Sequence, residues 1–285
     1  MSGRGELVLV ATPIGNLGDL SPRAAEALAC ADLICCEDTR RTRALLSAAG
    51  IPAGNRLVSL HRDNEAERLG RVSRCVADGG TVVVVSDAGT PGISDPGAWL
   101  AGQLAAAGET VTTVPGPSAA IGALVVSGLP TERFCVEGFL PRKGAVRRGR
   151  LSALMSDDRT SVVFEAPARV ASTLAELAAI DPTRPVAVVR ELTKVHEEVW
   201  RGSLRHAADT FADAPPRGEV VLVVGGSPPA AAPDEHTLEV AVRAALSDDP
   251  SAGPRQVADR VAATLGVPKR RAYEVTLRLR SREKR

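Results

Sequence analysis

A strand-like run followed by a loop of glycines, prolines and aspartates is the strongest sign of chemistry in this 285-residue sequence. The run 81–85 (TVVVV) leads into 86–97 (SDAGTPGISDPG), which directly precedes a helix-like segment. Ligands bind at the carboxyl ends of the strands in open α/β sheets. Asp87 can accept hydrogen bonds from a ribose or an ammonium group, and the backbone at Gly89 and Thr90 can approach a ligand closely. This loop therefore predicts a ligand site.

Two further turns between a strand-like and a helix-like segment have a similar form. The run 7–12 (LVLVAT) precedes the glycine-containing loop 13–20 (PIGNLGDL), which can direct backbone N–H groups at a polar or anionic ligand. The stretch 114–120 (VPGPSAA) places Ser118 at a helix start, where a serine is usually an N-cap. Neither turn has GxGxxG, Walker A or GxSxG spacing, so a ligand site and a plain chain reversal both stay open.

Charged residues follow two other strand-like runs. Glu37, Asp38 and Arg40 end the run ICCEDTR, and Glu191 and Lys194 end the run VVRELTK. Neighbouring carboxylates can serve as acid and base while cations hold phosphates, but the same residues also suit helix caps and solvated strand ends. No HExxH, paired CxxC or carboxylate cluster with metal spacing occurs in the sequence, so we expect no metal site.

The elements that must position these residues are ten short apolar runs, rich in Val and Ile, that alternate with helix-length segments up to residue 226. The apolar positions are continuous, which predicts sheets covered on both faces and an α/β fold. Five runs precede Pro115 and five follow it, so we expect two consecutive α/β domains, residues 1–116 and 117–227. The run 197–203 follows the run 185–192 closely enough to form an antiparallel pair with it.

A small helical extension is expected after these domains. Residues 228–237 have the composition of a linker, and residues 238–285 have helical patterns. Gly266 and Pro268 separate two helices, the second of which opens with basic residues. This outline is that of a helix-turn-helix nucleic-acid module, and a plain helical hairpin that caps the body or pairs with a second copy is the alternative.

The charge distribution predicts a polyanionic partner. Ten basic and three acidic residues from Arg255 onward give +7, while the preceding residues sum to −6. A second island, 140–150 (LPRKGAVRRGR), contains no acid and is expected to be a loop. Two basic patches on an acidic body favour nucleic acid, against the alternative of solvated surfaces. The expected contacts are Arg142, Lys143, Arg147, Arg148, Lys269, Arg270 and Arg271.

The sequence disfavours an integral membrane protein and a secreted protein. The apolar runs are much shorter than the roughly 18 residues of a membrane-spanning helix, and the start of the sequence lacks the pattern of a signal peptide. The five cysteines have no CxxC spacing and suit reduced thiols, so a cytoplasmic protein is expected. With only seven aromatic residues, recognition of RNA by base stacking cannot dominate over shape and phosphate contacts.

Eight motifs, in register from about residue 6 to residue 226, closely resemble the branch of the tetrapyrrole (class III) methylase superfamily that modifies small-subunit ribosomal RNA. They are TPIGNLGDLSPRAAEAL, DLICCEDTR, SLHRDNE, VVSDAGTPGISDPG, VPGPSA, GLPTERFCVEGFLPRKG, FEAPARV and VVRELTKVHEEVWRG. The resemblance implies S-adenosylmethionine as the cofactor, a cleft for it between the two domains, and a homodimer. The implied reaction is methylation of a ribose 2′-hydroxyl of a cytidine in the decoding centre of 16S rRNA, within the small ribosomal subunit.

The resemblance also assigns residues. Those implied to bind the cofactor are Ile14, Asp87, Gly89, Thr90, Ser118, Ala119, Phe164, Leu192 and Val220. For catalysis, the hypothesis is that Glu37, Asp38 or Glu191 orients or deprotonates the hydroxyl, while Arg40 and Lys194 hold flanking phosphates.

Two other functions compete with this one. The loop PIGN replaces the GxGxGD-like run of many tetrapyrrole enzymes, and the basic patches suit no porphyrinoid, so a small-molecule tetrapyrrole methylase is the less favoured alternative. A non-catalytic RNA-binding assembly factor that keeps the fold is the second.

Overall fold

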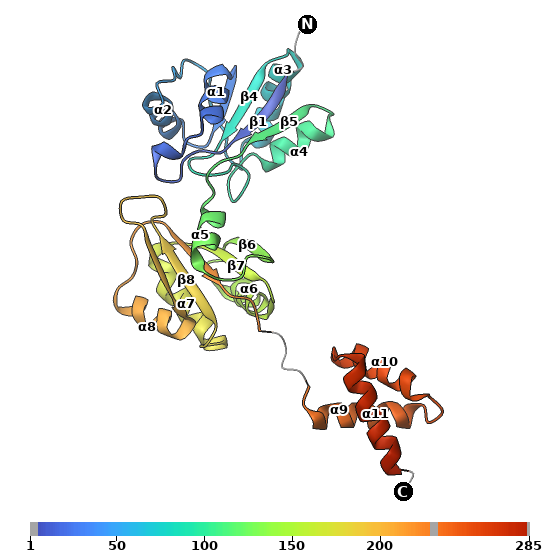
Figure 1. Cartoon of the computed structure of the whole chain (residues 1–285). Coiled ribbons are helices and arrows are strands. Elements are labelled where there is room, and N and C mark those ends of the chain that lie inside the picture. Colours follow the sequence, from blue (N-terminus) through green and yellow to red (C-terminus); the bar gives the residue numbers. More distant parts are fainter. Residues whose placement is uncertain (1–4, 229–232, 284–285) are drawn as a thin grey trace. The chain divides into compact units, whose positions relative to one another are not determined.

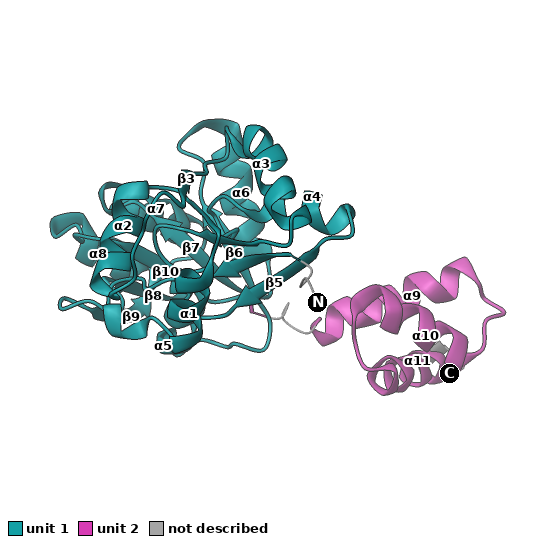
Figure 2. Cartoon of the chain, turned by 90° about the horizontal axis from the view of Figure 1, so that it is seen from above, with its two compact units in different colours: residues 1–227 teal, residues 228–285 magenta. Residues whose placement is uncertain are grey.

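The computed structural model describes residues 5–228 and 233–283 of the chain. Its contacts divide the chain into two compact units, residues 1–227 and residues 228–285 (Figure 2). Residues 1–227 contain two five-stranded sheets, so the α/β prediction is confirmed, whereas their division into domains 1–116 and 117–227 stays a prediction.

The first sheet is entirely parallel and has the strand order β3-β2-β4-β1-β5. Figure 1 labels its neighbouring strands β4, β1 and β5. Its strands are β1 (Glu6–Val10), β2 (Leu33–Cys36), β3 (Leu57–Ser59), β4 (Thr81–Val85) and β5 (Thr110–Val114). The helices of this half are α1 (Pro22–Cys30), α2 (Thr39–Ala48), α3 (Glu65–Ala77) and α4 (Ala98–Ala106), with a 3₁₀ turn η1 (Leu17–Asp19).

Both faces of the central strands of the first sheet are buried, while the edge strand β5 is largely exposed. Val83 and Val85 of β4 belong to one apolar cluster with α1, while Val82 and Val84 belong to another with α3 and α4. Alternate residues of one strand point to opposite faces, so a strand that is buried on both needs a continuous apolar run. The parallel topology places the carboxyl ends of all five strands at one edge.

The second sheet is mixed, with the order β6-β7-β10-β8-β9. Its strands are β6 (Phe134–Phe139), β7 (Thr160–Glu165), β8 (Pro185–Arg190), β9 (Glu198–Ser203) and β10 (Val220–Val224), and its helices are α5 (Ala119–Ser127), α6 (Gly144–Ser156), α7 (Pro167–Ile180) and α8 (Leu204–Asp213). Strand β10 is antiparallel to β7 and β8, and the predicted antiparallel pairing of β8 with β9 is confirmed.

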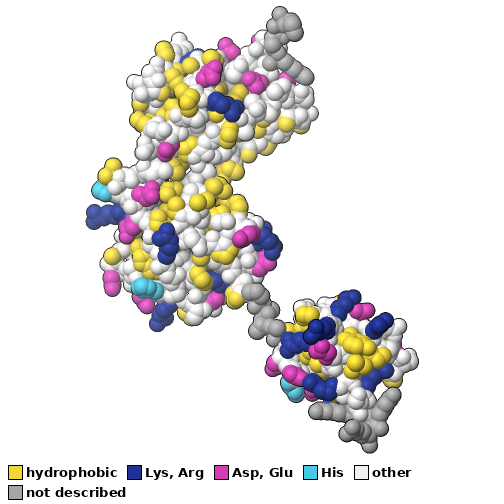
Figure 3. All heavy atoms as spheres, in the orientation of Figure 1, with side chains coloured by type: hydrophobic (Ala, Val, Ile, Leu, Met, Phe, Trp, Pro, Cys, Tyr) yellow, Lys and Arg dark blue, Asp and Glu magenta, His cyan; other side chains and the backbone are white. Residues whose placement is uncertain are grey.

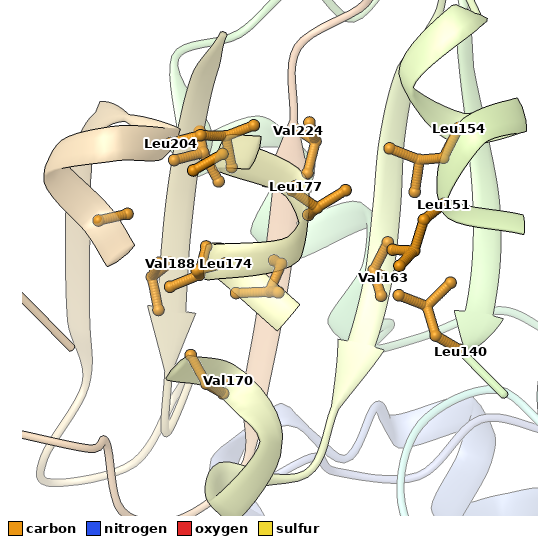
Figure 4. Close-up of a cluster of buried hydrophobic side chains, with 14 of the residues drawn as sticks. Leu140, Leu151, Leu154, Val163, Val170, Leu174, Leu177, Val188, Leu204 and Val224 are labelled. Carbon is orange, nitrogen blue, oxygen red and sulfur yellow. The ribbon is translucent and has the colours of Figure 1, made fainter. Parts of the chain in front are cut away.

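Helices cover both faces of the second sheet's central strands, β7, β10 and β8, as well. On one face α6, α7 and α8 pack on alternate strand residues, and Figure 4 shows Leu151 and Leu154 of α6 meeting Val163 of β7. On the other face α5 packs against the intervening residues, including Val162 and Val223.

The C-terminal unit consists of α9 (Glu235–Asp248), α10 (Pro254–Leu265) and α11 (Lys269–Glu283) around a core of its own. The predicted separation of two helices is confirmed, because α10 ends at Leu265 and its C-cap, Gly266, has a φ of 64° that suits glycine. Part of the predicted linker 228–237 is wrong: α9 already begins at Glu235, with the Asp234 side chain capping it. Residues 229–232 of that linker lie outside the described residues.

Candidate functional site

A cavity of about 390 Å³ opens where the carboxyl ends of the first sheet's central strands approach the second sheet. This volume lies within the range of small-molecule sites. Seven of the nine residues predicted to bind a cofactor line it: Ile14, Gly89, Thr90, Ser118, Ala119, Phe164 and Val220. The motifs that contain them are therefore brought together in space, although their cofactor role stays a prediction.

The loop after β4 forms one wall of this cavity and is held in place by hydrogen bonds. The backbone N–H of Gly89 donates to the carbonyl of Thr12 (3.0 Å), and the N–H of Thr12 donates to the carbonyl of Gly89 (2.9 Å). Thr90 Oγ1 donates to the carbonyl of Pro117 (3.2 Å). Gly89 has a φ of +83°, and a Cβ there would lie 3.3 Å from Ile14 Cγ2. The wall is therefore preformed, with bare backbone at Gly89.

Ser118 and Ala119 bring a helix N-terminus to the cavity. Ser118 is the N-cap of α5, since its side chain accepts a hydrogen bond from the N–H of Ile121. A capping role is what a serine at this position most often has, and it does not remove Ser118 from the cavity wall. The positive end of the helix dipole favours a negatively charged or polar ligand group here.

Two predicted cofactor residues lie outside this cavity. Asp87 Oδ1 accepts the backbone N–H of Asp38 (2.9 Å), and its other oxygen lies 3.5 Å from Arg41 Nη1, so Asp87 joins the end of β4 to the start of α2. Leu192 lines a neighbouring hollow and packs against Gly122 of α5. Cofactor binding by Asp87 and Leu192 stays a prediction without support from the cavity.

The predicted catalytic group after β2 lies at the carboxyl edge of the first sheet. Asp38 caps α2 and accepts hydrogen bonds from the side chain and the backbone N–H of Arg40, which hold the pKa of Asp38 at about 2. A carboxylate with so low a pKa is a poor base. Arg40 is itself 90% exposed in its side chain. Burial, and then the charge of Asp87, raise the pKa of Glu37.

Glu191 and Lys194 form an ion pair next to Gly218 and Glu219, two residues of the cavity's second wall. Glu191 accepts the backbone N–H of Glu219 (2.8 Å) and Lys194 Nζ (2.9 Å), and these hydrogen bonds lower its pKa. Gly218 has a φ of +82°, and a Cβ on it would clash with the Glu191 carboxyl group. Glu191 therefore holds the backbone of residues 218–219, both of which line the cavity. The role of Glu191 as a base and that of Lys194 in holding a phosphate stay predictions.

Three residues that line the cavity and could contact a ligand were not singled out from the sequence: Asp95, Phe139 and Glu165. Burial, and then the charge of Glu37, raise the pKa of Asp95 to about 6. The available signal was its place as the second aspartate of SDAGTPGISDPG. Glu165 is buried, and its oxygens accept the N–H of Ala166 (2.9 Å) and the hydroxyl of Thr173 (2.7 Å).

The predicted RNA contact at Arg147 is wrong. Its guanidinium donates to both oxygens of Glu176 (3.0–3.1 Å), to Thr173 Oγ1 (2.9 Å) and to the carbonyl of Pro141 (3.0 Å), and the residue is only 5% exposed. The physical reason is that α6 starts at Gly144, so the expected loop 140–150 is largely helical and turns this one arginine inward. Arg142, Lys143 and Arg148 are exposed.

In the C-terminal unit, Lys269 and Arg270 line a groove of about 380 Å³ with Arg255, Asp259 and Tyr273. Lys269 is paired with Asp259 (2.9 Å), and Arg270 with Glu274 (3.0 Å). Figure 3 shows several Lys and Arg side chains on the face of this unit turned to the viewer. The groove has positive charge, while the partly exposed Arg271 lies outside it.

Residues 5–228 and 233–283 contain neither a metal-binding cluster nor a membrane-spanning helix. No group of three or more His, Cys, Asp or Glu side chains there is arranged to hold a metal ion. No helix in the same part of the chain is both long and apolar enough to cross a membrane.

Comparison with known proteins gives a family and its relatives. The family model of tetrapyrrole (corrin/porphyrin) methylases matches residues 6–208. A "Ribosomal RNA small subunit methyltransferase I" of Mycobacterium tuberculosis is 46% identical over 97% of this chain and 96% of its own length. The protein of that name from Synechocystis is 41% identical over 96% of this chain and 98% of its own.

Solved structures show the same fold at low identity. A cobalt precorrin-4 methyltransferase matches with a TM-score of 0.57 and 17% identity, over 78% of this chain and 95% of that one. A uroporphyrin-III C-methyltransferase of Thermus thermophilus, in complex with S-adenosylhomocysteine, matches with a TM-score of 0.53 and 22% identity, over 78% of this chain and 97% of that one.

Proposed function

The chain belongs to the tetrapyrrole methylase family, and from this premise we propose that it transfers a methyl group from S-adenosylmethionine to the ribosomal RNA of the small subunit. The observation that carries the proposal is the likeness, over nearly the full length, to relatives named for that activity. The C-terminal unit lies within the matched length, so the likeness is not confined to the methylase fold.

The cavity fits S-adenosylmethionine in size and in chemistry. Its walls are mostly apolar, with Ile14, Phe139, Phe164 and Val220 available to an adenine ring and a methionine chain. The start of α5 suits the cofactor's carboxylate. When bound, the cofactor supplies a methyl carbon that is made electrophilic by its sulfonium. Bare backbone at Gly89 lets the ligand approach without a Cβ in the way.

We propose that the acceptor is the ribose 2′-hydroxyl of a cytidine in the decoding centre of 16S rRNA, presented by the small subunit. Methyl transfer from a sulfonium neutralises charge, so positioning the hydroxyl in line with the methyl group supplies most of the acceleration. Exposed Arg40, Arg142, Lys143 and Arg148 are suited to hold phosphates in sequence-independent contacts. The basic groove of the C-terminal unit is suited to the same work.

We further propose that the protein acts in the cytoplasm as a homodimer. Apolar side chains of α5 that a monomer would leave in water support the homodimer, since Val125 is 67% exposed and Ile121 45%. Light scattering of the purified protein at several concentrations measures the state, and a monomer throughout would contradict it.

The proposed function is tested with S-adenosylmethionine that carries a labelled methyl group. The acceptors are small subunits from cells that lack the modification, naked 16S rRNA and a porphyrinoid precursor. Label in a cytidine ribose of the assembled subunit supports both reaction and substrate. Label in the porphyrinoid alone supports a tetrapyrrole methylase instead. RNA binding without any affinity for the cofactor supports a non-catalytic assembly factor.

A further inference from the structure

We propose that Asp95 accepts the proton of the acceptor hydroxyl, because it is the cavity carboxylate that no described cation or backbone N–H holds in an ion pair or hydrogen bond, at the point where the cavity meets an arginine-bearing edge. The inference rests on the proposed function and deepens it. It moves the role of base from Glu37, Asp38 and Glu191 to a residue of the loop after β4 that lines the cavity directly.

Elimination among the acidic residues that line the cavity leaves Asp95. These residues are Asp95, Glu165 and Glu219. Glu165 has a completely buried side chain whose two oxygens are both occupied by donors, and Arg169 lies 3.2 Å from it as well. Glu219 is 71% exposed in its side chain and is paired with Lys194 at 3.2 Å. Asp95 is half-buried, and the Ser86 hydroxyl is its one hydrogen-bonding neighbour given by the described residues.

The position of Asp95 also suits an RNA acceptor. The loop that carries it is fixed by Arg62, which donates to the carbonyl of Ser94 (2.6 Å). Arg62 and Arg41 are exposed at the carboxyl edge of the first sheet, where Arg41 faces Asp87 at 3.5 Å. Arginines at this edge can bind phosphates next to the cavity mouth. A nucleotide held there brings its ribose toward the cavity wall to which Asp95 contributes.

The charged groups that face Asp95 come from three strand ends. Glu37 follows β2, Asp87 precedes Asp95 in the loop after β4, and Arg62 follows β3. Burial and the two carboxylates raise the pKa of Asp95 to about 6, while Arg62 opposes them. At pH 7 to 8 the group is therefore ionised, yet it is a stronger base than an ordinary aspartate. Asp38 and Glu191, whose pKa values are lowered, lack this property.

The step balances without a further reactant. The hydroxyl oxygen forms a bond to the methyl carbon as the bond from that carbon to sulfur breaks, and the bonding pair stays on sulfur. The hydroxyl proton passes to Asp95 and from there to water. No oxidant, reductant or metal is needed, and the products are the methylated ribose and S-adenosylhomocysteine.

The experiment compares the wild type with Asp95→Asn, using Asp209→Asn as a matched control. Asp209 lies on α8, is 68% exposed in its side chain and pairs only with Arg205 among the described residues. Transfer to small subunits is followed from pH 5 to 9, and affinity for S-adenosylhomocysteine is measured by calorimetry. We expect Asp95→Asn to lower the maximal rate by about 10² to 10⁴, the usual contribution of a general base, and to change the affinity by less than about twofold.

The pH profile distinguishes a proton acceptor from a structural residue. The wild-type rate should rise through a midpoint near pH 6, and the residual rate of Asp95→Asn should lack this limb. Glu37→Gln removes a like charge and should move the limb to lower pH. Asp209→Asn should keep both the rate and the limb.

Three results would overturn the assignment. A normal rate and pH profile in Asp95→Asn would assign the proton to another acceptor. A rate loss that is matched by lost affinity would make Asp95 a cofactor ligand. If the wild type itself transfers no methyl group to RNA, the proposed function fails and the role of Asp95 falls with it; an active wild type separates that outcome from the other two.

Discussion

Replacement of Arg147 by alanine should destabilise the protein and leave RNA binding intact, although the residue belongs to the basic island at 140–150. Its guanidinium bonds a carboxylate, a hydroxyl and a carbonyl, and its side chain is 6% exposed. Hydrogen bonds to charged groups contribute about 1.5 to 3 kcal/mol each, and each buried methylene of the stem about 0.8 kcal/mol. Breaking a buried pair costs about 3 to 5 kcal/mol overall.

The structure places Arg147→Ala at the low end of that range. The partner Glu176 is 41% exposed in its side chain, so its carboxylate regains water when the arginine is removed. Thr173 still donates to Glu165. We therefore expect a loss of about 3 kcal/mol in the free energy of unfolding, which for a unit of this size lowers the melting temperature by about 6 to 12 °C.

Arg148→Ala is the matched control, one residue further along α6 and exposed. It should change stability by less than about 0.5 kcal/mol and should weaken RNA binding, with a salt slope lower by about one. Calorimetric melting and filter binding of RNA at several salt concentrations measure both properties. The reasoning would be refuted if Arg147→Ala melted like the wild type, or if it bound RNA as weakly as Arg148→Ala while remaining folded.

The cavity wall at Gly218, the buried carboxyl group of Asp95 and the C-terminal unit can each be tested by one variant. Gly218→Ala places a Cβ against the Glu191 carboxyl group at a residue whose φ is positive. Calorimetry should therefore show an affinity for the cofactor that is reduced by about tenfold or more, which corresponds to about 1.4 kcal/mol. The control Gly149→Ala, where a Cβ on α6 meets open space, should leave that affinity unchanged. The folded pKa of Asp95, about 6, exceeds its ordinary value of 3.8, so the stability that it confers below pH 4 is lost as the pH rises through 6. Asp95→Asn should therefore melt higher than the wild type at pH 8, and an equal or lower melting temperature there would contradict this. Removal of residues 228–285 should weaken RNA binding and reduce the dependence of that binding on salt concentration. The affinity for the cofactor should stay unchanged, because residues 1–227 have hydrophobic cores of their own. A loss of cofactor binding would argue against separate roles of the two units in binding cofactor and RNA.

The central strands could be predicted from the sequence because burial on both faces of a sheet leaves a local pattern, whereas the edge strands β5, β6 and β9 are largely exposed. All ten expected runs are strands, and the turns at Gly89 and Ser118 lie at strand ends as anticipated. The C-terminal helices were also predictable from their spacing and from the glycine at 266, whereas the start of α9 was placed three residues too late.

Burial of a single charged residue was harder to predict. Arg147 lies four residues before Leu151 and seven before Leu154, both of which are buried, so it shares their helix face. That periodic signal was present, but an acid-free run of cations favoured a solvated loop. The partner that makes burial tolerable, Glu176, lies 29 positions further on, and no local pattern joins the two residues.

Asp95 shows a second limit of the same kind. Its raised pKa depends on burial and on Glu37, which lies 58 positions earlier in the chain, and their proximity exists only after β2 and β4 pair. The loop is predicted to be a ligand site with Asp87 as its carboxylate, because nothing local shows that Asp95 is the aspartate that lines the cavity. The fold separates them, because Asp87 turns to the start of α2 while Asp95 lines the cavity.

The mixed second sheet explains why the cavity draws on both ends of its strands. Ligand sites of parallel sheets lie at carboxyl ends, which accounts for the loop after β4 and for Phe164 near the end of β7. Strand β10 runs the other way, and its first residue, Val220, pairs with Glu165 on one side and with Arg190 on the other. The amino end of β10 therefore lies at the same edge as the carboxyl ends of β7 and β8. One reversed strand thus brings residues 218–221 into the cavity wall, and it sets Glu191 beside Glu219 to hold that wall in place.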